Sequence, residues 1–167
     1  GWQADTQLLR YSNGVRPQKG LNLAIAVYPT LLDGEEGFAD YVLFEGLMPV
    51  AVVEAKKQNK TVSQYIRQAE RYSQGFQFAS DLDKPYKNTP WTSEEKVYHI
   101  PFVYACNGQK QSKRLADEGG IWFRDVRHPS NISKVLQGFH SPAGLKRKLE
   151  QDIARADEYL EQTEILP

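Results

Sequence analysis

The sequence predicts a single α/β domain, with a central mixed β-sheet flanked by helices, on three observations. A length of 167 residues and a mass of 19.1 kDa suit one domain with a substantial core. Apolar runs of strand length recur along the chain. Other segments instead repeat their apolar residues at helical spacing, between and after these runs. Strands interspersed with helices are typical of an α/β domain.

Strands are predicted at about residues 21–28, 39–44, 50–56, 97–105 and 121–125. Pro29 would end the first of them. The second and third would form a hairpin, because the intervening residues 45–49 contain Gly46 and Pro49, which favour a turn. Pro101 indicates an edge or a bulge within the fourth strand.

Three helices are predicted between and after these strands. Thr61 would cap a helix over about 61–74, and Gly75 would help to end it. Ser130 would cap a helix over 132–139. Ser141 and Pro142 would begin a third helix. Its narrow apolar stripe, which needs a partner in this domain or in a following one, consists of Leu145, Leu149, Ile153, Ala156 and Leu160.

Composition narrows the possible functions. The 21 basic and 21 acidic residues cancel, so net charge does not indicate nucleic-acid binding, and any such contact must come from local patches. The single Cys106 cannot form an internal disulfide and is expected to be a small buried residue in a reducing compartment. No run is long and apolar enough to span a membrane and no signal peptide opens the chain, so we expect a soluble, cytoplasmic protein.

A candidate site lies at the end of the predicted hairpin. If Phe44 faces Val50 across the turn, Asp40 faces Glu54 on the same side of the sheet. Glu54 shares its face with Lys56, and a one-residue slip would scatter the three. Opposed carboxylates repel unless a cation lies between them, and Mg²⁺ prefers oxygen ligands.

The adjacent Lys56 could orient a water or stabilise charge on a phosphate, so the set indicates metal-assisted phosphodiester hydrolysis. The alternative is a surface hairpin with solvated charges, which is the usual setting of Glu-x-Lys. The strongly apolar strand before Glu54 weakens that alternative.

The predicted helix over 61–74 adds two candidates. Gln68 and Tyr72 are four residues apart and lie on one side of the helix. A glutamine at the edge of an amphipathic helix is usually a boundary residue, but beside two carboxylates it becomes a site candidate. We also expect a basic rim that contacts DNA phosphates, formed by Lys57, Lys60, Arg67 and Arg71.

Several other sites are absent from the sequence. There is no phosphate-binding Gly-x-x-x-x-Gly-Lys-[Ser/Thr] loop and no Gly-x-Gly-x-x-Gly. His99, His128 and His140 lack metal-ligand spacing, and Cys106 has no evident histidine partner for a thiol nucleophile.

The ordered set of Asp40, Glu54-Ala55-Lys56 and Gln68-x-x-x-Tyr72 resembles the PD-(D/E)xK nuclease superfamily, which implies a restriction-endonuclease-like core. More narrowly, residues 38–44 and 52–57 resemble the amino-terminal nuclease domain of the R subunits of type I restriction enzymes. Residues 101–108, 120–125 and 139–142 also resemble these subunits, so the resemblance covers most of the chain. Glu-x-Lys alone is weak, but the ordered combination is specific. The superfamily often has proline at the position of Ala39. This branch commonly tolerates another residue there.

The resemblance implies a Mg²⁺-dependent endonuclease, with Mn²⁺ as a substitute metal, that hydrolyses phosphodiester bonds of double-stranded DNA. Asp40, Glu54 and the backbone carbonyl of Ala55 would bind the metal, and Lys56 would be the catalytic lysine. Gln68 and Tyr72 would support the site and the DNA backbone.

The resemblance also implies a domain organisation. Residues 1–140 would form the nuclease domain and residues 141–167 a helix connecting it to an ATP-driven motor domain, which this chain does not encode. ATP would serve only that motor, and methylase and specificity subunits would complete the complex. We therefore expect a fragment or an excised domain. Family members carry an amino-terminal helix, often with a further acidic residue, before the position of Gly1, and its loss would weaken metal binding and the domain edge.

Two alternatives stay open. The first is a non-cleaving module for DNA docking or a subunit interface, for which the striped helix from Ser141 is the best feature. A nuclease would cleave DNA when Mg²⁺ is present, whereas this module would bind DNA without Mg²⁺ and would not cleave it. The second is a repair or homing nuclease of the same superfamily.

Overall fold

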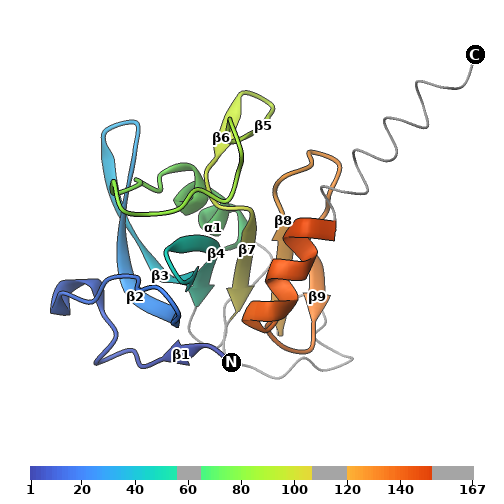
Figure 1. Ribbon diagram of the computed structural model, residues 1–167. Helices are drawn as coiled ribbons and strands as arrows, with labels where there is room; N and C mark the ends of the chain where they lie inside the picture. Colours follow the sequence, from blue (N-terminus) through green and yellow to red (C-terminus); the bar gives the residue numbers. More distant parts are fainter. Residues whose placement is uncertain (56–64, 107–119, 152–167) are drawn as a thin grey trace, which may run out of the picture.

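The computed structural model describes residues 1–55, 65–106 and 120–151 (Figure 1). Its main feature is a mixed sheet in which two parallel strands, β4 and β7, lie at the centre. In spatial order the strands are β1 (Gln3–Ala4), β2 (Asn22–Leu32), β3 (Glu35–Glu45), β4 (Met48–Ala55), β7 (Phe102–Cys106), β8 (Ile121–Asp125) and β9 (Lys134–Leu136). A short 3-10 turn, η1 (Tyr11–Asn13), precedes β2.

Each face of the sheet is covered by one described helix (Figure 1). On one face α1 (Ile66–Gln74) buries Ile66 and Ala69 in a cluster with Val52 and Val103. On the other face the helix at 142–151 buries Leu145 and Leu149 against strand residues that include Val53, Tyr104 and Phe123. Successive strand residues point to opposite faces, so these side chains alternate along the strands with those that face α1. The prediction of an α/β domain with a central mixed sheet flanked by helices is thus confirmed. Of the helices in the described ranges, none is long and apolar enough to cross a membrane.

The hairpin of β3 and β4 keeps the predicted register at the end that carries Asp40. Tyr41 pairs with Val53 and Leu43 with Ala51, as the prediction requires. The register then shifts, because Phe44 pairs with Pro49 and not with Val50. The predicted pairing of Phe44 with Val50 is therefore wrong, and the extra residue forms a bulge next to the turn.

Strands β2 and β3 are longer than predicted. β2 continues through Pro29 to Leu32, and the turn is confined to Asp33 and Gly34, whose φ angles of 51° and 81° are left-handed. A proline is tolerated here because the pairing of β1 with β2 covers only Leu23 and Ala24, so β2 has β3 alone as its sheet neighbour near Pro29.

Two predictions in the second half of the chain need correction. The predicted strand over 97–105 is divided at Pro101 into β6 (Lys96–Tyr98), which pairs with β5 (Trp91–Ser93), and β7. The predicted helix over 132–139 is wrong, because β9 pairs with β8 there. Backbone pairing to an existing sheet edge overrides the weak helical pattern of so short a segment.

The third predicted helix begins where the sequence places it. Residues 142–151 are helical, and Oγ of Ser141 accepts a hydrogen bond of 3.0 Å from the backbone N–H of Gly144. Ile153, Ala156 and Leu160, the rest of the predicted stripe, lie outside the described residues.

Candidate active site

Asp40 lies beside the end of β4. Its Oδ2 accepts a hydrogen bond of 2.7 Å from the backbone N–H of Ala55, so the carboxylate reaches the residue next to Glu54. Tyr41, which follows Asp40, pairs with Val53, which precedes Glu54, so the neighbours of the two carboxylates are in the predicted register. The structure therefore brings Asp40 and the Glu54–Ala55 end of β4 together, as the hairpin argument predicts.

Val27 distorts the sheet directly opposite Asp40. The pairing of β2 with β3 omits these two residues, although Ala26 pairs with Tyr41 and Tyr28 with Ala39 on either side. Val27 has a φ angle of 52°, which is rare for a β-branched residue. Because of this break, Asp40 is not part of the regular pairing with β2. On the side of β4, its carboxylate accepts the hydrogen bond from Ala55. Sequence reasoning missed Val27, because nothing in an apolar run marks a left-handed residue.

The oxygen donors at the end of β4 fit a magnesium ion. Asp40 and Glu54 are carboxylates and Ala55 adds a backbone carbonyl, which is the hard oxygen set that Mg²⁺ prefers. Glu54 is only 2% exposed, and a carboxylate is stable at such depth when its charge is compensated. Within the described residues, no group of three or more His, Cys, Asp or Glu could hold a metal. Any ion here would complete its shell with water or substrate oxygens, as Mg²⁺ usually does.

Three predicted basic residues cannot be placed. Lys56, Lys57 and Lys60 lie outside the described residues. The predicted roles of Lys56 in the chemistry and of Lys57 and Lys60 in the basic rim therefore stay predictions.

Helix α1 turns its predicted site residues into a groove against the hairpin of β2 and β3. Nε2 of Gln68 donates a hydrogen bond of 2.8 Å to the hydroxyl of Tyr72, forming what we call the Gln68–Tyr72 pair. Arg71 makes an ion pair of 3.2 Å with Glu35, and both side chains are largely exposed. The groove has a volume of about 350 Å³ and is lined by Thr30, Leu32, Glu35, Glu36, Gly37, Arg67, Gln68, Arg71 and Tyr72.

The groove and the Asp40 carboxylate share one strand. Gly37 lines the groove and Asp40 lies three residues further along β3, which is roughly 10 Å at the rise of a strand. Arg67 and Arg71 of the predicted basic rim are in the groove with the Gln68–Tyr72 pair. The groove therefore offers hydrogen-bond donors and cations on the strand that carries Asp40, although neither Asp40 nor Glu54 lines it.

A partly buried ion pair that the sequence did not reveal attaches α1 to β8 on the same face of the sheet. Nη1 of Arg124 in β8 donates to Oε1 of Glu70 at 2.7 Å, and their side chains are 15% and 11% exposed. Arg124 also donates through Nε to the carbonyl of Asn131 at 2.9 Å. Residues so distant in sequence give no local signal of their contact.

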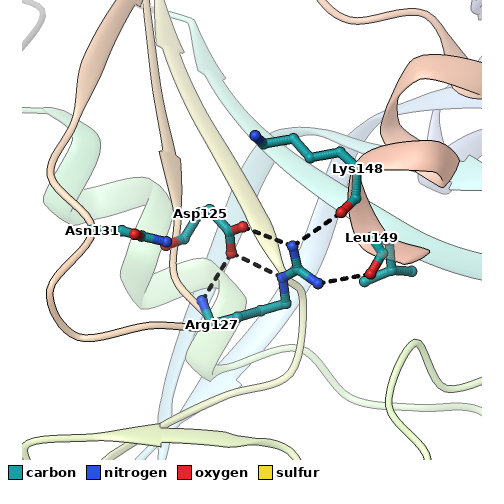
Figure 2. Close-up of polar contacts among 5 residues, drawn as sticks. All are labelled: Asp125, Arg127, Asn131, Lys148 and Leu149. Carbon is teal, nitrogen blue, oxygen red and sulfur yellow. Dashed lines mark hydrogen bonds and ion pairs between the residues drawn. The ribbon is translucent and has the colours of Figure 1, made fainter. Parts of the chain in front are cut away.

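A second ion pair serves the opposite face (Figure 2). Nε and Nη2 of Arg127 donate to the two carboxylate oxygens of Asp125 at 3.0 and 2.8 Å. The same guanidinium donates to the carbonyls of Leu149 at 3.0 Å and Lys148 at 3.4 Å, in the helix at 142–151. We call this set the Asp125–Arg127 clamp. It joins β8 to the helix across from α1, so its role in this geometry is structural.

Comparisons with known proteins agree with the resemblance seen in the sequence. Residues 3–149 match the family model described as the second domain of the type I restriction enzyme EcoKI endonuclease subunit. The chain is also 40% identical over 177 residues to the type I restriction enzyme EcoKI endonuclease subunit of Escherichia coli (strain K12). That match covers 95% of this chain and 15% of the length of the relative. No solved structure matches the chain. The chain therefore belongs to the family of domains found in the endonuclease subunits of type I restriction enzymes.

Proposed function

We propose that this domain is the nuclease centre of a type I restriction enzyme, with a restriction-endonuclease-like core that hydrolyses phosphodiester bonds of double-stranded DNA in a Mg²⁺-dependent reaction. The observation that carries the proposal is the hydrogen bond of 2.7 Å from Ala55 to Asp40, which draws one carboxylate to the strand end that carries another. The ordered residues of the PD-(D/E)xK pattern and the family membership support it.

In this proposal the end of β4 holds the metal. Asp40, Glu54 and the carbonyl of Ala55 would bind Mg²⁺, or Mn²⁺ in its place, which when bound supplies a Lewis acid and an activated water. The N–H of Ala55 fixes the orientation of the Asp40 carboxylate. Lys56 stabilises the charge that develops on the phosphate.

The groove beside α1 would position the DNA. The Gln68–Tyr72 pair supports the site from the helix, and Arg67 and Arg71 approach the DNA phosphates together with Lys57 and Lys60. Such contacts weaken as salt rises, because binding releases counterions. In the full enzyme the motor domain of the same subunit would use ATP, and the methylase and specificity subunits would be further partners in the cytoplasm.

The described part of the striped helix does not support the non-cleaving alternative. Leu145 and Leu149 of the striped helix are buried against β4, β7 and β8 within this domain. The described part of the stripe is therefore used internally, and it does not favour a separate docking function.

The test replaces site residues in the full-length endonuclease subunit assembled in its complex. Asp40→Ala and Lys56→Ala should lower DNA cleavage by roughly 100-fold or more, since each removes transition-state stabilisation. Gln68→Ala should do less, because it acts from the neighbouring helix. ATP hydrolysis and duplex binding should be retained in all three, which would identify a nuclease centre separate from the motor.

Matched controls are available on the exposed surface. Asp83→Ala and Lys96→Ala remove exposed charges of the same kinds away from the groove, and both should cleave at the wild-type rate. Wild-type cleavage by Lys56→Ala would show that Glu54-Ala55-Lys56 is an ordinary strand end and that the proposal is wrong.

A further inference from the structure

Gly37 lies under the ring of Tyr72. A Cβ added to Gly37 would lie 3.0 Å from Cε1 of Tyr72 and 3.0 Å from Oγ1 of Thr30, a closer approach than in nine of ten such contacts in proteins. The backbone of Gly37 is not left-handed, so the glycine is not needed for an unusual φ angle. What it provides is space, which lets the aromatic ring approach the backbone of β3.

This close approach affects where the Tyr72 hydroxyl lies. The hydroxyl accepts the hydrogen bond of 2.8 Å from Gln68, and both side chains line the same groove as Gly37. A ring pushed away from β3 would carry its hydroxyl with it. The amide of Gln68 would then lose its partner or follow it to a new position.

Other contacts of α1 act on the helix as a whole. The ion pair of Glu70 with Arg124 holds one side of it. Its carboxyl end is held by Gly75, whose carbonyl accepts a hydrogen bond of 2.9 Å from the N–H of Leu31. Gly37 differs from these, because it contacts a side chain of the candidate site.

We propose that Gly37 is a positioning residue for DNA cleavage. Because Gly37 has no side chain, the Tyr72 ring packs directly against the backbone of β3, three residues before Asp40. The Tyr72 hydroxyl then holds the Gln68 amide in the groove through their hydrogen bond. This inference rests on the proposed nuclease function. It adds a residue that the PD-(D/E)xK pattern does not contain.

The test is Gly37→Ala in the full-length subunit assembled in its complex, with cleavage measured at saturating DNA. The cleavage rate should fall roughly tenfold, since the ring must give by a few tenths of an ångström and a misplacement of about 1 Å can cost about 100-fold. ATP hydrolysis should be unchanged. Gly138→Ala is the matched control, because a Cβ at Gly138 would meet no atom within 4 Å, and it should cleave at the wild-type rate.

A double-mutant cycle separates positioning from a general packing defect. In a Tyr72→Phe background the hydrogen bond to Gln68 is already gone, so adding Gly37→Ala should lower cleavage less than about twofold further. A tenfold loss that persists in this background would overturn the inference, as would wild-type cleavage by Gly37→Ala alone.

A second variant keeps the test decisive if Gly37→Ala lowers the folded fraction. Thr30→Ala removes one of the two close contacts, so the step from Thr30→Ala to Thr30→Ala/Gly37→Ala should show the same tenfold loss through Tyr72 alone. No loss at that step would overturn the inference. If Asp40→Ala and Lys56→Ala abolish cleavage while Gly37→Ala cleaves at the wild-type rate, the positioning role fails and the nuclease function stands. Wild-type cleavage by Asp40→Ala and Lys56→Ala would instead contradict the proposed function itself.

Discussion

The two faces of the sheet are attached to their helices by ion pairs of different depth, both involving arginines of β8 or the residues just after it. On the α1 face Arg124 meets Glu70 through a single contact, with side chains 15% and 11% exposed. On the other face the side chains of Arg127 and Asp125 are 1% and 6% exposed. They make two parallel hydrogen bonds, and Arg127 also reaches two helix carbonyls (Figure 2).

The two ion pairs therefore indicate that the two faces of the sheet hold their helices with different strength. The face with the Asp125–Arg127 clamp is held by the more deeply buried contact. The face with the candidate site is held by a shallower contact, which is where local opening is expected to cost less. Helix α1, which carries the Gln68–Tyr72 pair, belongs to this second face.

Breaking the clamp should have the largest effect on stability. Asp125→Ala leaves the guanidinium of Arg127 buried without its carboxylate, and the free energy of unfolding should fall by about 3–5 kcal/mol. Urea denaturation of the domain measures this change. Asp83→Ala, an exposed control, should stay within about 0.5 kcal/mol of wild type. A loss below about 1 kcal/mol for Asp125→Ala would show that the clamp does not stabilise its face.

Breaking the pair on the α1 face should cost less. Glu70→Ala removes the carboxylate that accepts from Arg124, so the free energy of unfolding should fall by about 1.5–3 kcal/mol, the range for a hydrogen bond to a charged group. The same denaturation experiment applies. A loss as large as that of Asp125→Ala would reverse the proposed order of the two faces.

The smallest expected effect is a dependence of the unfolding free energy on pH, to which one histidine on each face contributes. Burial lowers the pKa of His99, with Lys84 adding to it, and burial with the charges of Lys148 and Lys134 lowers the pKa of His140. A folded pKa below the unfolded value means that the folded state binds fewer protons. Stability is therefore present above the unfolded pKa of about 6.5 and is lost as pH falls below it.

Substitution of either histidine should weaken this dependence. His99→Gln tests the α1 face, and His140→Gln tests the face on which Nδ1 of His140 meets the hydroxyl of Tyr104 at 2.6 Å. Each should flatten the fall in unfolding free energy below about pH 6.5, measured by denaturation at several pH values. An unchanged slope in both variants would show that neither imidazole is kept neutral by the fold.

The sequence predicted best the features that are coded locally. β8 begins and ends as expected, and the end of the hairpin carries Asp40 in the predicted register, because apolar runs and turn residues mark them. It failed where a distant neighbour decides the outcome. β9 is a strand because β8 offers it an edge, and Glu70 and Arg124 meet across 54 residues of chain.

The candidate site shows the same division. The order of Asp40, Glu54 and the Gln68–Tyr72 pair is readable in the sequence. The structure adds a hydrogen bond from Ala55 to Asp40 and one from Gln68 to Tyr72. The packing of Tyr72 against Gly37 cannot be predicted from the sequence. It depends on the distance between α1 and β3, and the residues between these two elements do not determine that distance.

The bulge at Val50 has a consequence for how this hairpin can change during evolution. It absorbs one residue of mismatch between the turn and the ladder, so the strand beyond it keeps its pairing with both β3 and β7. A turn that gained or lost a residue could be accommodated at the same place. A change of one residue in the loop at 46–47 should therefore leave the pairing of Tyr41 with Val53, next to Asp40 and Glu54, as it is.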